Sequence, residues 1–355
     1  MNLMNLRIPT KFVLLLLSLC AMSLQTVNAA QVRVLASIKP IQLIAKDMLG
    51  DLAQIDVLLP PGSSPHHYSL KPSSIAQIHD ADLFIWGGPG LELFLTKTVS
   101  QLEHPALALL EGGEAHHHGD EADEHHDHED EGDAHHDHDD EADAHHDHDD
   151  EVDAHHDHED EVDAHHDHED EADAHPEHDH DHGGSDPHFW MSPERALAAA
   201  DLIKDRLVER YPENAALYEQ AYDDFAARLA VTDQQLQQQL KAVGDTGFYV
   251  FHDAFGSFVE HYQLNQLGYF TVDPGRKPGA RRLNEIRTAL ETDKAQCVFV
   301  EPQFKAPVVT SLIRGLDIRV GRLDPLAIDI DAGPDGYSHY LQSLADSFTN
   351  CLSGK

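Results

Sequence analysis

The segment Val32–Gly62, with the sequence VRVLASIKPIQLIAKDMLGDLAQIDVLLPPG, decides the fold class of this chain. Val32–Ile38 and Ile55–Leu59 are apolar runs of strand length. Ile41–Leu49 lies between them, has the apolar spacing of an amphipathic helix, and is closed by Gly50. Strands that alternate with helical patterns are typical of parallel α/β units, because two parallel strands need a crossover between them. The segment therefore predicts an α/β lobe with a parallel sheet.

The same alternation continues along the chain. Asp82–Trp86 predicts a further strand of the first lobe and is followed by a turn rich in glycine. In the last third of the chain the predicted strands are Gly247–Phe251, Leu267–Val272, Gln296–Val300 and Ile318–Leu323, and the predicted helices are Phe255–Tyr262, Arg282–Thr292, Pro307–Leu316 and Tyr337–Leu352. We therefore expect a second parallel-sheet lobe.

Helices are predicted between the two lobes. Ser192, which is followed by a proline, is a good N-cap for a helix that reaches about Tyr211. A second helical pattern includes Leu217 and Leu240 and covers about 28 residues, or about 42 Å of helix. One long helix that joins the lobes fits this pattern, and so do two ordinary helices with a break near Thr232-Asp233. The predicted domains are an N-terminal lobe at 30–212, a linker helix at 213–243 and a C-terminal lobe at 244–355, with a ligand site in the cleft between the lobes.

Charge is concentrated in one segment. The 355 residues include 65 acidic and 24 basic side chains and 30 His, for a net charge of −41. Residues 114–182 contain 22 of the His and 33 of the acidic residues without any Lys or Arg, so this segment alone carries −33. An excess of acid excludes nucleic acid as a partner, because phosphate binding requires Lys and Arg.

Residues 114–182 are repetitive as well as charged. Glu121–Asp170 consists of five decamers of the form E-x-D-x-H-H-D-H-[DE]-D, with almost nothing apolar to bury. We expect a disordered loop inside the N-terminal lobe. A solvated acidic linker is one interpretation. The density of imidazoles favours additional weak sites for Zn²⁺ and similar divalent cations, each weakened by the entropy lost on ordering.

The N-terminus predicts export. Residues 1–29 combine a positive start, the apolar run Phe12–Leu24 and the small residues of a cleavage site, as in a secretory signal peptide. The apolar run is shorter than the roughly 20 residues that a retained membrane anchor needs. Cleavage would leave Cys297 and Cys351 as the remaining cysteines. In an oxidising compartment such a pair is most simply a disulfide, and two buried thiols are the alternative.

Three histidines lie where a predicted element begins or ends. His66 follows the strand Ile55–Leu59, His188 precedes the helix capped by Ser192, and His252 follows the apolar run that ends at residue 251. Loops at the carboxyl ends of strands carry the binding groups of α/β proteins, so these imidazoles are candidates to converge on a Zn²⁺ ion. Taken singly, each is better explained as a solvated or hydrogen-bonded loop side chain, and only the three together favour a metal site.

Two carboxylates have similar positions. Glu301 and Asp324 each follow a predicted strand. Either is able to complete a metal site, to cap a helix, or to pair with an arginine such as Arg322. A zinc hydrolase with Glu301 as its base is a further possibility, but the chain contains no H-E-x-x-H signature of that class.

Four motifs together carry a resemblance to a known family. They are Pro65-His66-His67-Tyr68, Asp186-Pro187-His188-Phe189-Trp190, Phe251-His252-Asp253-Ala254-Phe255 and Val300-Glu301-Pro302-Gln303-Phe304. With Leu323-Asp324-Pro325-Leu326 and both remaining cysteines, they resemble the solute-binding proteins of zinc ABC importers, the ZnuA type. The resemblance implies two α/β lobes bridged by one long helix, with the metal held between the lobes.

The resemblance also implies site residues and partners. It implies His66, His188 and His252 as ligands, with Asp324 or a water as the fourth, and Glu301 as a structural or outer group. Manganese members have a Glu at the position of His252, so His252 favours zinc over manganese or iron. The implied protein is a periplasmic monomer and not an enzyme. It carries Zn²⁺ as a transported ligand to an ABC transporter permease and its ATPase. A periplasmic zinc buffer acting through residues 114–182 is the rival interpretation.

Overall fold

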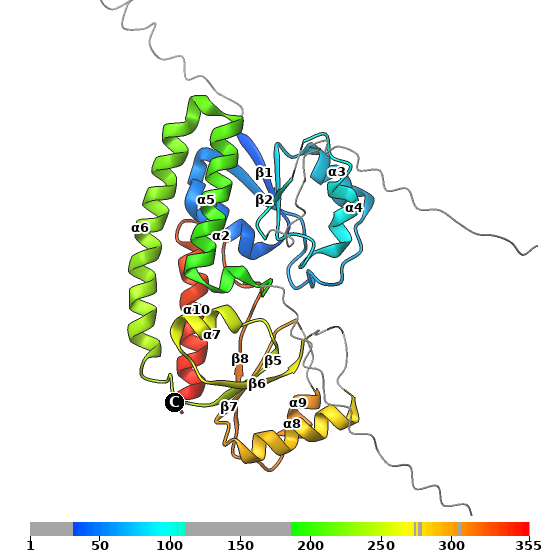
Figure 1. Ribbon diagram of the computed structural model, residues 1–355, viewed down its shortest axis with the longest axis vertical. Coiled ribbons are helices and arrows are strands. Elements are labelled where there is room, and N and C mark those ends of the chain that lie inside the picture. Colours follow the sequence, from blue (N-terminus) through cyan, green and yellow to red (C-terminus); the bar gives the residue numbers. More distant parts are fainter. Residues whose placement is uncertain are drawn as a thin grey trace, which may run out of the picture. The chain divides into compact units, whose positions relative to one another are not determined.

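The computed structural model describes residues 31–104, 106–110, 186–272, 275, 279–303 and 307–354. Residues 1–29, predicted as a signal peptide, and residues 114–182, predicted as a disordered loop, lie outside the described residues. No helix in the described ranges combines the length and the apolar character that crossing a membrane would require. The described residues form two parallel sheets with helices around them, as Figure 1 shows.

The N-terminal lobe contains the sheet β2-β1-β3-β4, in which all neighbouring strands are parallel. Its elements are β1 (Val32–Ala36), α2 (Lys39–Leu49), β2 (Ala53–Val57), α3 (Pro72–Asp80), β3 (Leu83–Trp86), α4 (Thr96–Val99) and β4 (Leu107–Ala108). The strand–helix–strand unit predicted from Val32–Gly62 is present, with α2 almost wholly buried. Neither β4 nor the short helix α4 was predicted, because two and four residues are too few to show a period.

The C-terminal lobe repeats this strand order as β6-β5-β7-β8, again all parallel. Its elements are β5 (Phe248–His252), α7 (Gly256–Tyr262), β6 (Gln266–Thr271), α8 (Ala280–Thr292), β7 (Cys297–Val300), α9 (Pro307–Leu312), β8 (Arg319–Arg322) and α10 (Gly336–Leu352). Cys297 at the start of β7 forms a disulfide with Cys351 near the end of α10. The predicted pairing of the two cysteines is therefore confirmed.

One long helix runs beside both sheets (Figure 1). α5 (Pro193–Arg210) begins at the predicted cap, where the Ser192 hydroxyl accepts a hydrogen bond from the Arg195 N–H. α6 (Ala215–Leu240) then continues without a break for 26 residues, or about 39 Å. It contacts α2 and α5 along one part of its length and α7 and α10 along another (Figure 1). The predicted α/β class, with two parallel-sheet lobes joined by one long helix, is confirmed.

The residues that suggested a break in α6 make tertiary contacts instead. The Thr232 hydroxyl donates to Ser338 of α10 at 3.2 Å. The Asp233 carboxylate lies 2.7 Å from the ring of His261 in α7. Both polar side chains therefore fasten α6 to the C-terminal lobe, and the helix stays continuous.

An ion pair between an exposed arginine and a buried aspartate ties α6 to the N-terminal lobe. Asp47 of α2 accepts a hydrogen bond from Arg228 of α6 at 2.9 Å, and its second oxygen accepts from the Tyr337 N–H of α10 at 3.2 Å. Most of the buried apolar side chains of both lobes, of α6 and of α10 belong to a single continuous core. The two lobes are therefore packed on common helices.

Candidate metal centre

Two loops and the end of a strand bring the predicted histidines together. His66 lies in the segment between β2 and α3, His188 directly precedes the short helical turn Phe189–Met191, and His252 is the last residue of β5. One ring nitrogen from each of the three lies within 4.8 Å of the others. In a tetrahedral zinc site with Zn–N bonds of about 2.0–2.1 Å, the nitrogens are about 3.4 Å apart. Small side-chain movements thus suffice to close the three rings on one ion.

A small cavity separates the three rings. The ring centroid of His66 lies 5.4 Å from that of His188 and 5.6 Å from that of His252. The ring centroids of His188 and His252 are 5.0 Å apart. The cavity has a volume of about 20 Å³, which is room for about one water-sized particle. It is lined by Ser64, Pro65, His66, His188, His252, Glu301, Gln303, Pro325 and Leu326. A single ion fits this space and an organic solute does not.

Two of the three imidazoles are buried. His188 is 3% and His252 is 4% exposed, whereas His66 is partly exposed. Burial lowers the pKa of His188, against the opposing effect of its hydrogen bond with Asp186. The neutral ring is the form that binds metal ions. The Nε2 atoms of His188 and His252 have no hydrogen-bond partner, so both remain available in the cavity.

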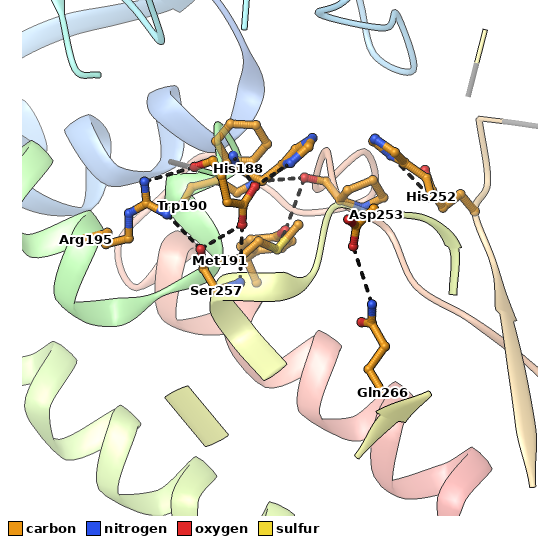
Figure 2. A network of polar contacts seen from close by, with 12 residues as sticks. His188, Trp190, Met191, Arg195, His252, Asp253, Ser257 and Gln266 are labelled. Carbon is orange, nitrogen blue, oxygen red and sulfur yellow. Dashed lines mark hydrogen bonds and ion pairs between the residues drawn. The ribbon is translucent and has the colours of Figure 1, made fainter. Parts of the chain in front are cut away.

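Asp186 orients the ring of His188. Its Oδ1 lies 2.9 Å from His188 Nδ1 and also accepts from the His188 backbone N–H at 3.0 Å. A carboxylate at Nδ1 fixes the tautomer and directs Nε2 toward a metal. Figure 2 shows this network, with the rings of His188 and His252 directed toward one another. An aspartate two residues before a histidine, with proline between them, is a local signal for such a turn.

The other oxygen of Asp186 reaches the C-terminal lobe. Oδ2 accepts from the Ser257 hydroxyl at 2.8 Å and from the Ser257 N–H at 3.3 Å, at the start of α7. Arg195 of α5 donates to the Ser257 hydroxyl at 2.8 Å and to the Asp186 carbonyl at 2.9 Å. Burial alone would raise the pKa of Asp186, but the interactions with His188 and Ser257 outweigh it and hold this pKa at about 2. Neither Ser257 nor Arg195 was identified from the sequence.

His252 also faces a carboxylate on its Nδ1 side. Glu301 follows β7, is 3% exposed and lines the cavity. Its Oε1 lies 3.6 Å from His252 Nδ1. Neither oxygen of Glu301 has a hydrogen-bond partner, which is unusual for a buried carboxylate.

Asp324 has a different environment. One oxygen accepts from Gln303 Nε2 at 2.9 Å and from the Leu326 N–H at 3.0 Å, and the other accepts from the Ile328 N–H at 2.6 Å. Burial raises the pKa of Asp324, whereas the two backbone hydrogen bonds lower it. Asp324 does not line the cavity and is not among the three residues whose ligand atoms converge. Its assignment as the fourth ligand stays a prediction.

Buried aromatic side chains make hydrogen bonds to a residue that lines the cavity. The carbonyl of Pro325, a lining residue, accepts hydrogen bonds from Trp190 Nε1 at 2.8 Å and from the Tyr340 hydroxyl at 3.2 Å. The Tyr337 hydroxyl donates to the Trp190 carbonyl at 2.7 Å. Because Trp190 follows His188 by two residues, α10 holds both the His188 segment and the loop after β8.

The fold and the site define a class of protein. Two parallel α/β lobes on shared helices, with a one-ion cavity lined by imidazoles, are typical of a metal-binding solute receptor. A family model described as ZnuA, the periplasmic component A of the zinc-uptake complex, matches residues 34–351. This chain belongs to that family.

Characterised relatives agree with the family. The chain is 44% identical to the high-affinity zinc uptake system protein ZnuA of Haemophilus influenzae, over 95% of this chain and 99% of that protein. It is 36% identical to the ZnuA protein of Yersinia pestis, over 92% of each chain. The identity covers almost the whole length of both relatives.

Solved structures share the fold. A crystal structure of ZnuA has a TM-score of 0.64 and 23% sequence identity, and the match covers 90% of this chain and 99% of that one. The AdcAII protein of Streptococcus pneumoniae has a TM-score of 0.64 and 20% identity, covering 92% and 100% of the two chains. At these identities the likeness shows the fold alone.

Proposed function

We propose that this protein captures Zn²⁺ between its two lobes and delivers it to the permease of an ABC importer, whose ATPase supplies the energy. The observation that carries the proposal is the convergence of His66, His188 and His252 on a cavity the size of one ion. The family and the zinc-uptake relatives support the same cargo.

The chemistry of the site favours zinc. Three neutral imidazole nitrogens suit Zn²⁺ better than Mn²⁺, which prefers oxygen ligands. Because both lobes pack on α6 and α10, we expect capture and release to need only a small hinge movement.

The remaining parts of the proposal follow from sequence. We infer a periplasmic monomer, exported through residues 1–29, whose function is transport and not catalysis. Asp324 or a water is proposed as the fourth ligand of the site. Residues 114–182 are proposed to bind further Zn²⁺ weakly through their imidazoles.

Calorimetric zinc titration tests the site in the cleft. The mature protein and a variant lacking residues 114–182 should each show one tight site, and the weaker sites should disappear with the deleted residues. Replacing His188 by Ala in the deletion variant should abolish tight binding. A tight site that disappears together with residues 114–182 would overturn the proposal, because the cleft would then not be the high-affinity site.

Growth under zinc starvation separates delivery from storage. A strain without this protein should fail to take up trace zinc, and the deletion variant lacking 114–182 should restore most of that uptake. Normal uptake without the protein would favour the rival function, a periplasmic zinc buffer.

A further inference from the structure

Glu301 is a buried carboxylate that the zinc site, as described so far, does not use. It is 3% exposed, lines the cavity with the three histidines, and has no hydrogen-bond partner on either oxygen. A buried carboxyl group without a hydrogen bond destabilises a folded protein, because its lost hydration is not replaced. Its presence beside the cavity needs a functional reason.

The position of Glu301 relative to His252 supplies one. Its Oε1 lies 3.6 Å from Nδ1, on the side of the ring away from the atom that has to bind metal. Asp186 faces the Nδ1 atom of His188 in the same way but at 2.9 Å, which is a hydrogen bond, whereas the contact of Glu301 with His252 is longer. Each of the two buried imidazoles therefore has a carboxylate behind it.

The other carboxylate near the site does not compete for this role. Both oxygens of Asp324 already accept hydrogen bonds, and Asp324 does not line the cavity. Glu301 is also absent from the group whose ligand atoms converge within 4.8 Å. Its geometry is that of a group behind a ligand and not of a ligand.

We propose that Glu301 is a positioning residue for zinc capture: its carboxylate lies beside Nδ1 of His252 and holds the ring with Nε2 directed into the cavity. This inference rests on the proposed function. Carboxylates behind metal-binding histidines orient the ring and raise its basicity, and their loss typically weakens metal affinity by about 10–100-fold.

The test compares E301Q with wild type, both in the chain lacking residues 114–182. Zinc affinity is measured by competition with a chromophoric chelator, thermal unfolding is measured on the metal-free protein, and the visible spectrum is recorded with Co²⁺. E301Q should bind zinc about 10–100-fold more weakly. Its Co²⁺ bands should keep the intensity of wild type, because the number of ligands is unchanged.

A matched control is available in the N-terminal lobe. Glu92 is also fully buried but does not line the cavity. E92Q should leave the zinc affinity unchanged, so a general effect of neutralising a buried glutamate is separated from an effect on the site. E301D, which keeps the charge and shortens the side chain, provides a second variant if E301Q does not fold.

Several results would overturn the inference. Zinc affinity of E301Q within threefold of wild type would show that Glu301 has no part in capture. A lower melting temperature with unchanged affinity would make it a structural residue. A loss of Co²⁺ band intensity would make it a ligand. If wild type itself lacks a tight site in this chain, the proposed function fails, and that outcome is independent of the variant.

Discussion

Removing the carboxylate of Asp186 should weaken both zinc binding and folding. Asp186 accepts hydrogen bonds from the His188 ring and backbone and from the Ser257 hydroxyl and backbone. In D186A the ring of His188 loses the group that sets its tautomer, and the start of α7 loses its bond to the N-terminal lobe. We therefore expect two separate effects with separate magnitudes.

The magnitudes follow from these bonds. Hydrogen bonds to a charged group contribute about 1.5–3 kcal/mol each, and the side chain of Asp186 is 28% exposed, so water replaces part of what is lost. We expect D186A to lower the free energy of unfolding by about 2–4 kcal/mol. Zinc affinity should fall by about 10–100-fold, or about 1.4–2.8 kcal/mol.

Two measurements and one comparison variant check this prediction. Urea unfolding of the metal-free protein gives the stability, and chelator competition gives the affinity. S257A removes the hydroxyl that donates to Asp186 but leaves the Ser257 N–H bond and the bond between Asp186 and His188, so it should cost about 1 kcal/mol and affect affinity less than D186A. If D186A binds zinc as tightly as wild type, the orientation of His188 by Asp186 is refuted.

Three further predictions concern other parts of the molecule. Burial raises the pKa of Glu92 to about 7, despite hydrogen bonds from Ser37 and Gly87. Because the folded pKa exceeds the usual 4.5, the contribution of Glu92 to stability is fully present below pH 4.5 and should fall by on the order of 3 kcal/mol as the pH rises to 7, a loss that urea unfolding of E92Q should not show. Replacing both cysteines of the disulfide by Ser should lower stability by about 4 kcal/mol on the chain-entropy account while zinc titration still shows a tight site. H252E should shift metal preference toward Mn²⁺ in competition titrations, and an unchanged preference would count against His252 as a ligand.

Much of the fold was predictable because it rests on local patterns. The strand–helix–strand unit at Val32–Gly62 and the N-cap at Ser192 formed where expected. The disulfide followed from the predicted oxidising compartment. The break considered at Thr232-Asp233 did not occur, because both side chains bond to neighbouring helices that are distant in sequence. The two-residue strand β4 gave no periodic signal at all.

By itself, the sequence determined the two lobes, a helical segment between them and three candidate imidazoles, because periodicity, capping and residue chemistry are properties of short segments. Only the tertiary structure decided how the carboxylates are used. In the folded chain Asp324 accepts hydrogen bonds from the backbone, and Asp186 binds both His188 and Ser257. Glu301 lies beside His252 without a hydrogen bond. These roles depend on which groups meet across long separations in the chain, and hydrogen bonding and burial are fixed only when those segments pack.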